Sequence, residues 1–239
     1  MDGTNILNNL KQFIKTILKN LHIDPTLNMK YDRQTEKVIQ KLLKPTSNTI
    51  DVGCHKGEML EKFMKASPKG VHFAFEPIPA MFHGLTQKYA GQNCRVFPYA
   101  LAEKPGQAEF NFVKNAPAYS GLKQRKYAVD KPEIEKIQVE IKTLDEVIPA
   151  NVKIDFIKID VEGAEYGVLR GGSETVKKNK PVIIFECGIG ASDFYGTTPA
   201  AVHELIVHEY GLHLSTMQRW LKNEKPFAEN EFIETYNQA

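Results

Sequence analysis

The chain has 239 residues, of which 42% are hydrophobic and 25% are charged, a globular composition that excludes wholesale disorder and collagen-like repeats. Its 31 lysines and arginines nearly balance 29 aspartates and glutamates, so the net charge of +2 gives no reason to expect an obligatory nucleic-acid partner. The three cysteines have neither a disulfide nor a metal-binding spacing, and the N-terminus lacks a signal-peptide pattern. We therefore expect a cytoplasmic protein in a reducing compartment, without a transmembrane segment.

Residues 1–44 are expected to form an N-terminal helical extension. Apolar residues recur every three or four positions over residues 5–21, while lysines occupy the opposite face, so an amphipathic helix is predicted there. This helix could pack on the main domain as a lid over the ligand cleft, or make a peripheral contact with an anionic membrane. A second helix is predicted from Tyr31 to Leu43, before Pro45.

Short apolar strands alternate with helices over residues 45–239, which predicts a parallel sheet with helices on both faces. The expected strands are 49–52, 71–75, 95–97, 154–159 and the fully apolar, central 182–185, followed by final strands at 212–215 and 232–236. Residues 104–142 interrupt this alternation. Within them, 108–112 and 137–141 alternate like half-buried strands, so we expect an antiparallel insertion.

The turn after the first strand predicts a nucleotide-type cofactor site. It reads Asp51-Val52-Gly53-Cys54-His55-Lys56-Gly57, and its glycines permit a sharp turn and a close approach to a ligand. The dinucleotide fingerprint G-x-G-x-x-G is absent. Glu76, after the second strand, can accept hydrogen bonds from two ribose hydroxyls, and Asp51 can hold an amino group or an ordered water. S-adenosylmethionine (SAM) offers a ribose and an ammonium without a phosphate. The predicted cofactor-binding residues are Asp51, Gly53, Cys54, Gly57, Glu76, Pro77 and Ala100.

Four blocks of the sequence, in this order, resemble the FkbM family of SAM-dependent methyltransferases. They are Asp51-Val52-Gly53 with Gly57, then Phe75-Glu76-Pro77, then residues 157–165 (Ile-Lys-Ile-Asp-Val-Glu-Gly-Ala-Glu) with Leu169 and Gly171, and finally Phe185-Glu186. The resemblance covers about residues 47–215, and residues 158–165 are its most specific part. Cys54-His55 stands where the family usually has Ala-Asn, which changes the chemistry beside the cofactor.

The resemblance implies a class I methyltransferase fold, a Rossmann-like, doubly wound α/β sheet that is mostly parallel with an antiparallel last strand. It also implies methyl transfer to an oxygen, often a hydroxyl of a sugar or a secondary metabolite. The residues leave two alternatives open. One is a non-catalytic binding module with the same fold. The other is a nucleotide-cofactor oxidoreductase, which the missing fingerprint disfavours.

Methyl transfer to an alcohol requires a group that shares the hydroxyl proton. Asp160 is the first candidate for this base, because it ends a predicted strand where ligands of open α/β sheets bind. Glu186 ends another strand, and His55 lies in the cofactor loop with a side chain that titrates near neutral pH. Glu162 and Glu165 either act nearby or cap the following helix. These carboxylates could also hold Mg²⁺, although no spacing requires it and no metal ligands are assigned.

The acceptor is expected between two loops, which contain Tyr119-Ser120-Gly121 and Asp193-Phe194-Tyr195-Gly196. Lys158, in a strand that should be buried, is expected to pair with a carboxylate. The sequence thus predicts a SAM-dependent O-methyltransferase that acts on a hydroxyl of a saccharide or another small metabolite.

Overall fold

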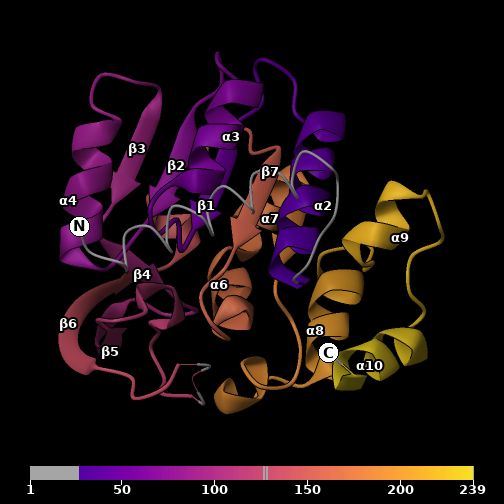
Figure 1. The fold of residues 1–239 in the computed structure, drawn as a ribbon. Coiled ribbons are helices and arrows are strands. Elements are labelled where there is room, and N and C mark those ends of the chain that lie inside the picture. Colours follow the sequence, from indigo (N-terminus) through magenta and orange to yellow (C-terminus); the bar gives the residue numbers. More distant parts are fainter. Residues whose placement is uncertain (1–26, 126, 128, 239) are drawn as a thin grey trace, which may run out of the picture.

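A parallel five-stranded sheet lies at the centre of the computed structural model, which describes residues 27–125, 127 and 129–238 (Figure 1). Its order is β3-β2-β1-β7-β8, and its strands are β1 (Thr49–Val52), β2 (His72–Phe75), β3 (Cys94–Phe97), β7 (Phe156–Ile159) and β8 (Val182–Phe185). The first strand, β1, lies in the middle of the sheet. The chain then adds β2 and β3 on one side of β1, and later β7 and β8 on the other side, which is the predicted doubly wound arrangement. Val52 pairs with both Phe75 and Ile159, so the carboxyl ends of these three strands are level.

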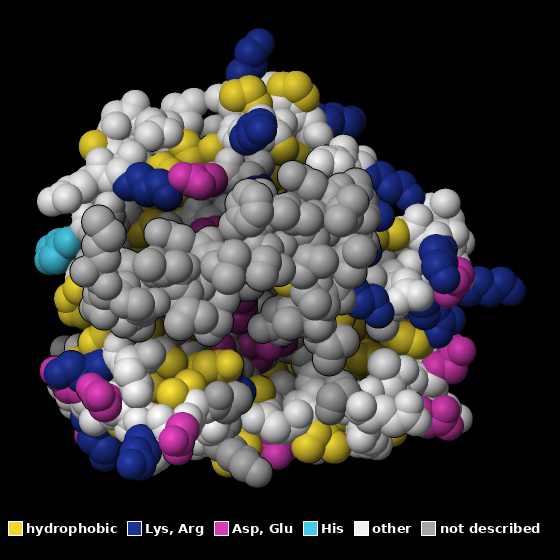
Figure 2. All heavy atoms as spheres, viewed as in Figure 1, with side chains coloured by type: hydrophobic (Ala, Val, Ile, Leu, Met, Phe, Trp, Pro, Cys, Tyr) yellow, Lys and Arg dark blue, Asp and Glu magenta, His cyan; other side chains and the backbone are white. Residues whose placement is uncertain are grey.

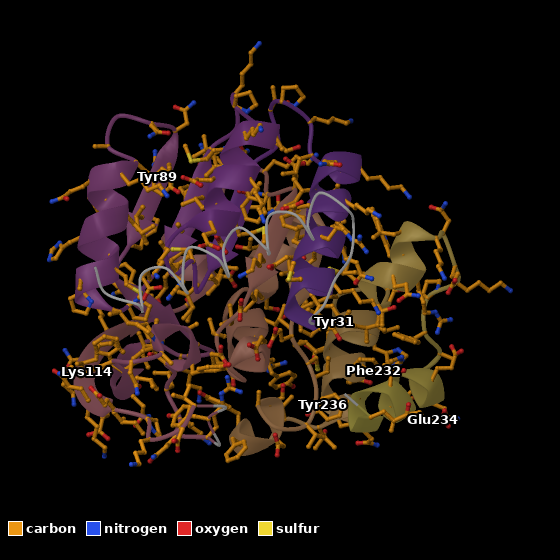
Figure 3. All side chains as sticks on the ribbon, viewed as in Figure 1. Tyr31, Tyr89, Lys114, Phe232, Glu234 and Tyr236 are labelled. Atoms are coloured by element: carbon orange, nitrogen blue, oxygen red, sulfur yellow. The ribbon has the colours of Figure 1, made fainter. Side chains whose placement is uncertain are left out.

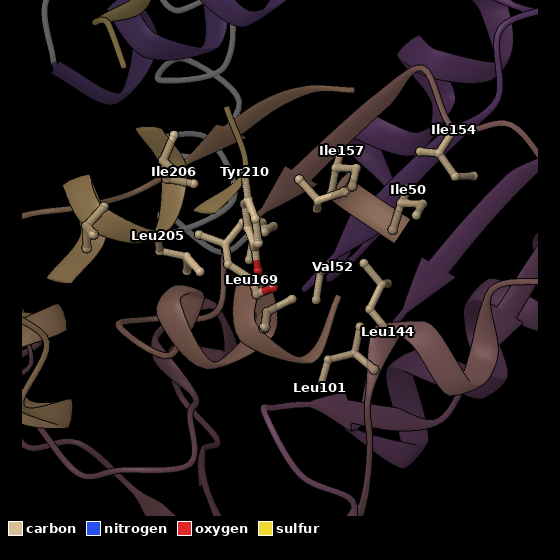
Figure 4. Packing of buried hydrophobic residues seen from close by; sticks show 14 of the residues in the cluster. Ile50, Val52, Leu101, Leu144, Ile154, Ile157, Leu169, Leu205, Ile206 and Tyr210 are labelled. Carbon is tan, nitrogen blue, oxygen red and sulfur yellow. Dashed lines mark hydrogen bonds between the residues drawn. The ribbon is translucent and has the colours of Figure 1, made fainter. Parts of the chain in front are cut away.

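Helices cover both faces of this sheet. They are α2 (Leu27–Leu42), α3 (Glu58–Ala66), α4 (Pro79–Lys88), α5 (Leu144–Val147), α6 (Glu165–Gly171), α7 (Ser173–Asn179), α8 (Pro199–His203), α9 (Met217–Leu221) and α10 (Glu229–Gln238), with a π-helix at Glu204–Glu209. Alternate strand residues face opposite sides. Ile50 and Ile157 pack with Leu205 and Tyr210 on one side (Figure 4), while Phe156 packs with α2 and α3 on the other. Burial on both faces explains why these strands are apolar throughout.

The predicted antiparallel insertion is present as β5 (Gly106–Val113) and β6 (Ile134–Lys142). The structure adds β4 (Tyr99–Leu101), which pairs in parallel with β6 and completes a three-stranded sheet. Ile78, at the start of α4, packs with Phe110 and Val139 of this small sheet. The small sheet therefore stands beside the carboxyl ends of β1 and β2 (Figure 1).

The two final strands predicted at residues 212–215 and 232–236 are absent. In the described part of the chain the main sheet is parallel throughout, and it lacks the expected antiparallel last strand. Residues 212–215 form no strand, and Phe232 and Tyr236 lie in α10 (Figure 3), because their separation of four residues places both on one helical face in the core. In addition, β8 is an edge strand and not a central one. Its two faces pack against different clusters, so its pattern is that of a buried strand.

The helix predicted over residues 31–43 is confirmed as α2. The amphipathic helix predicted over residues 5–21 lies outside the described residues, and the division at residue 44 stays a prediction. Of the helices that the structure describes, none combines the length and apolar character needed to cross a membrane.

Candidate active site

A cleft opens where the carboxyl ends of β1, β2 and β7 face the small sheet. Figure 2 shows acidic side chains at the bottom of a hollow near the centre of this face. The predicted site residues that line the cleft are Gly53, His55, Glu76, Pro77, Ala100 and Asp160. The predicted residues Asp51, Cys54, Gly57 and Glu186 are not among its lining residues.

The carboxylate of Glu76 is held at the cleft by two backbone groups. Its Oε2 accepts a hydrogen bond from the N–H of His55 at 2.9 Å, and its Oε1 accepts one from the N–H of Ile78 at 3.0 Å. The side chain is only 4% exposed, and burial raises the pKa of Glu76 to about 7. Because each carboxylate oxygen has two acceptor positions, both can still accept a hydroxyl of a ligand. This geometry fits the predicted contact with a ribose.

Gly53 allows the turns after β1 and β7 to touch. Its φ is +75°, and a Cβ at this position would lie 1.9 Å from the carbonyl oxygen of Asp160. The N–H of Asp160 in turn donates to the carbonyl of Val52 at 3.0 Å. Only glycine fits so close a backbone approach. Gly57 has a different role, because a Cβ there would lie 2.7 Å from the hydroxyl of Tyr89, so it serves the packing of α3 on α4.

Lys158 lies between two carboxylates, as the sequence predicted. Its Nζ is 3.0 Å from Oδ2 of Asp160 and 3.7 Å from Oδ1 of Asp51. Asp51 is completely buried, burial raises its pKa, and neither of its oxygens has a partner within hydrogen-bond distance in the described chain. Burial alone would lower the pKa of Lys158, but the two carboxylates raise it, so the ammonium stays charged. The cation that faces Asp51 here is therefore Lys158, where the sequence suggested a ligand amino group.

The side chain of Cys54 points into the core and not into the cleft. It is 5% exposed and packs with Leu60 and Leu85, and burial raises its pKa well above the ordinary value. The thiol is therefore protonated and inert at neutral pH. Any contact of Cys54 with a cofactor would come from its backbone.

The three candidate bases differ in position. Asp160 lines the cleft with a side chain that is 40% exposed. His55 also lines it, and its Nε2 is buried without a hydrogen-bond partner in the part of the chain that the structure describes. Burial, assisted by the charge of Lys56, lowers the pKa of His55, so its imidazole is neutral and able to accept a proton. Glu186 follows β8. Desolvation by the surrounding protein, and after it the negative charge of Asp160, raise the pKa of Glu186.

Glu165 organises the loop that carries Asp160 and Glu162. It is 2% exposed, and its Oε1 accepts hydrogen bonds from the N–H groups of Val161 at 3.1 Å and Gly163 at 3.2 Å. Burial raises the pKa of Glu165 to about 7. The sequence predicted a helix-capping role, and the structure shows a related one, because the carboxylate binds the turn before α6.

The two loops expected around the acceptor meet. The hydroxyl of Tyr195 accepts a hydrogen bond from the N–H of Lys123 at 2.9 Å, and a Cβ on Gly121 would lie 3.6 Å from that hydroxyl. An ion pair between Arg125 and Glu162 joins the insertion to the loop after β7. Sequence reasoning missed Arg125, because a single arginine in a long polar loop has no periodicity or motif that marks it.

Within residues 27–125, 127 and 129–238, no group of three or more His, Cys, Asp or Glu side chains is arranged to hold a metal ion. The possibility of a bound Mg²⁺ therefore gains no support from the described side chains.

Comparison with known proteins gives a family and one curated relative. A family model described as the methyltransferase FkbM domain matches residues 51–214. The chain is 28% identical over 184 residues to the 2-O-methyltransferase NoeI of Sinorhizobium fredii (strain NBRC 101917 / NGR234), with 72% of each protein covered.

Solved structures of methyltransferases also align with the chain. A TehB-like SAM-dependent methyltransferase from Corynebacterium glutamicum ATCC 13032 aligns with a TM-score of 0.40 and 10% identity, over 96% of this chain and 95% of that one. A SAM-dependent methyltransferase from Aquifex aeolicus aligns with a TM-score of 0.40 and 15% identity, over 76% and 81% of the two chains.

Proposed function

Because the chain belongs to the FkbM methyltransferase family, we propose that it is a SAM-dependent O-methyltransferase whose acceptor is a hydroxyl of a saccharide or another small metabolite. The observation that carries the proposal is the buried Glu76 carboxylate at the end of β2, beside the glycine turn of β1. The name of the relative NoeI, a 2-O-methyltransferase, supports oxygen as the atom that is methylated.

The residues at the ends of β1 and β2 fit SAM. Glu76 offers two carboxylate oxygens to the ribose hydroxyls, and Gly53 lines the cleft beside it. Pro77 and Ala100 also line the cleft and offer apolar surface to an adenine ring. When bound, SAM supplies an electrophilic methyl group on a sulfonium.

Asp160 is placed to orient the acceptor and to accept its proton. It lines the cleft one residue beyond β7, and Lys158 fixes one of its oxygens at 3.0 Å. A fixed carboxylate can align the acceptor hydroxyl and share its proton as the hydroxyl attacks. His55 is the second candidate, because its neutral imidazole has a buried, unpartnered Nε2 at the same cleft among the described residues. Glu186 is the third, at the adjacent strand end.

The proposal makes the acceptor a small molecule and requires neither a nucleic acid nor a membrane. All three cysteines are free, which supports the cytoplasm as its location. For residues 1–24 the proposed role is a lid over the cleft, and the alternative is a peripheral contact with a membrane.

The test is product formation with methyl-labelled SAM. The protein is incubated with a panel of methyl glycosides and with a small-molecule extract, and labelled products are identified by mass spectrometry, with Asp160→Asn as the matched control. The proposal expects a labelled methyl ether from the wild type and far less from the variant. Tight SAM binding without product from any acceptor would favour a non-catalytic binding module instead.

A further inference from the structure

We infer that Arg125 and Glu162 form an acceptor subsite that recognises a second hydroxyl of an uncharged saccharide, next to the hydroxyl that is methylated; this rests on the proposed function. The two residues come from different parts of the chain. Arg125 lies between β5 and β6, and Glu162 lies two residues beyond Asp160. Glu162 lines the cleft together with Asp160, and Arg125, which is not itself among the lining residues, is joined to the cleft through Glu162.

This ion pair is shielded from solvent but retains unused donors. Each of its side chains is only 15% exposed. A guanidinium has five N–H donors, and a single carboxylate cannot use them all. The Nε of Arg125 is buried and lacks a hydrogen-bond partner among the described residues, although the guanidinium lies 5.4 Å from the ring centre of Tyr119. An unpaired buried donor is costly, and a ligand oxygen would satisfy it.

The backbone at Glu162 indicates that this side chain has a role beyond the local fold. Its φ is +61°, in the left-handed region that glycine and asparagine adopt most easily. The next residue is Gly163, where a Cβ would lie 2.4 Å from the carbonyl of Ala191, so the turn is held tightly. A glutamate in this conformation is strained, and such residues cluster at ligand-binding sites.

The chemistry of the pair matches neighbouring hydroxyls of a sugar. A hydroxyl both donates and accepts, so one saccharide can donate to Glu162 and accept from Arg125. Asp160 and Glu186 lie near the pair, and their negative charge disfavours an anionic acceptor such as a phosphate or a carboxylate. Phe110, Pro117 and Leu122 give the cleft an apolar wall for the C–H groups of a sugar ring. The subsite therefore favours a neutral polyhydroxyl acceptor.

The test uses the conservative variants Glu162→Gln and Arg125→Lys, each of which keeps most of the side-chain volume. The control is Glu135→Gln, whose exposed partner Lys114 is 3.2 Å away in the same insertion and away from the cleft lining. Steady-state kinetics are measured with the methyl glycosides that the wild type methylates and with their monodeoxy analogues. SAM binding is measured by calorimetry, and thermal unfolding shows whether each variant is folded.

We expect KM for the glycoside to rise about tenfold or more in both variants, because a charge-assisted hydrogen bond is lost, while kcat and SAM affinity stay within about threefold. The deoxy analogue that lacks the recognised hydroxyl should bind the wild type weakly, and on it the variants should show no further loss. The control should match the wild type. If Glu162→Gln does not fold, the same comparison of KM between the glycoside and its deoxy analogues is made with Arg125→Lys alone.

Three results would overturn the inference. Unchanged KM in both folded variants would show that the pair is only a surface contact. An equal loss on the glycoside and on all its deoxy analogues would show that the pair only fastens the loop. In both cases methylation by the wild type would leave the proposed function standing. If the wild type methylates no glycoside, the saccharide proposal itself fails, and the subsite falls with it.

Discussion

The affinity for SAM should depend on pH through Glu76. Burial raises the pKa of this carboxyl to about 7, so it gains a proton as the pH falls through the neutral range. A protonated carboxyl donates one hydrogen and loses acceptor capacity for ribose hydroxyls. If only the ionised form binds the cofactor, the dissociation constant rises about tenfold for each pH unit below the pKa, which gives about 30-fold at about pH 5.5.

Isothermal titration calorimetry with SAM between about pH 5.5 and 8.5 measures this dependence. The Glu76→Ala variant should bind more weakly at high pH, by about 1.5–3 kcal/mol for each charge-assisted hydrogen bond lost, and should lack the slope assigned to Glu76. Comparing it with the wild type at each pH also cancels the titration of the ligand itself. Glu165→Gln is the matched control, because Glu165 has a pKa of about 7 as well but is not among the cleft-lining residues.

The reasoning would be refuted by a wild-type affinity that is flat across this range. It would equally be refuted if Glu76→Ala kept the wild-type slope, or if Glu165→Gln abolished it.

Three further predictions concern stability and turnover. Glu76 and Glu165 bind protons more tightly in the folded chain than in the unfolded one, so without cofactor the free energy of unfolding should fall as pH rises from about 4.5 to about 7, by up to about 3 kcal/mol for each carboxyl. Urea denaturation measures this, and rising stability over that range would contradict it. Gly53→Ala should destabilise the fold by about 3 kcal/mol or more, whereas Gly91→Ala, with φ of +74° but nothing within 4 Å of the new Cβ, should cost about 1–2 kcal/mol. Equal destabilisation by the two substitutions would contradict the conclusion that Gly53 is needed for the close approach of the Asp160 carbonyl. Asp160→Asn should lower kcat by ~10²-fold and leave SAM affinity within about threefold, as single-turnover kinetics and calorimetry would show, and unchanged turnover would assign the proton to another group.

Features set by local pattern could be predicted from the sequence. The glycine turn after β1, the small antiparallel insertion and the helix α2 follow from periodicity and turn residues close together in the chain. The helix α10 could not be predicted, because Phe232 and Tyr236 have a spacing that suits a short apolar strand as well as a helix. The edge position of β8 was equally hidden, since helices bury both of its faces.

The candidate site likewise contains residues whose positions a local pattern could predict and others whose positions it could not. The positions of Glu76 and Asp160 at the cleft could be predicted, because residues that follow parallel strands meet at one edge of the sheet, whereas their roles stay predictions. Asp51 alternates with Ile50 and Val52, so it faces the opposite side of the strand, where it is fully buried. Arg125 pairs with Glu162 through a contact between loops far apart in the chain, and no local pattern encodes such a contact.

The most direct test of the central claim is the identity of the methylated atom. The wild type is incubated with carbon-labelled SAM and a methylated glycoside product is isolated, and two-dimensional carbon–proton NMR then shows which atom of the acceptor carries the label. The account predicts a methyl ether on a ring hydroxyl, formed in equal amount with S-adenosylhomocysteine. A label on nitrogen or carbon, or S-adenosylhomocysteine formed without any methylated acceptor, would contradict it.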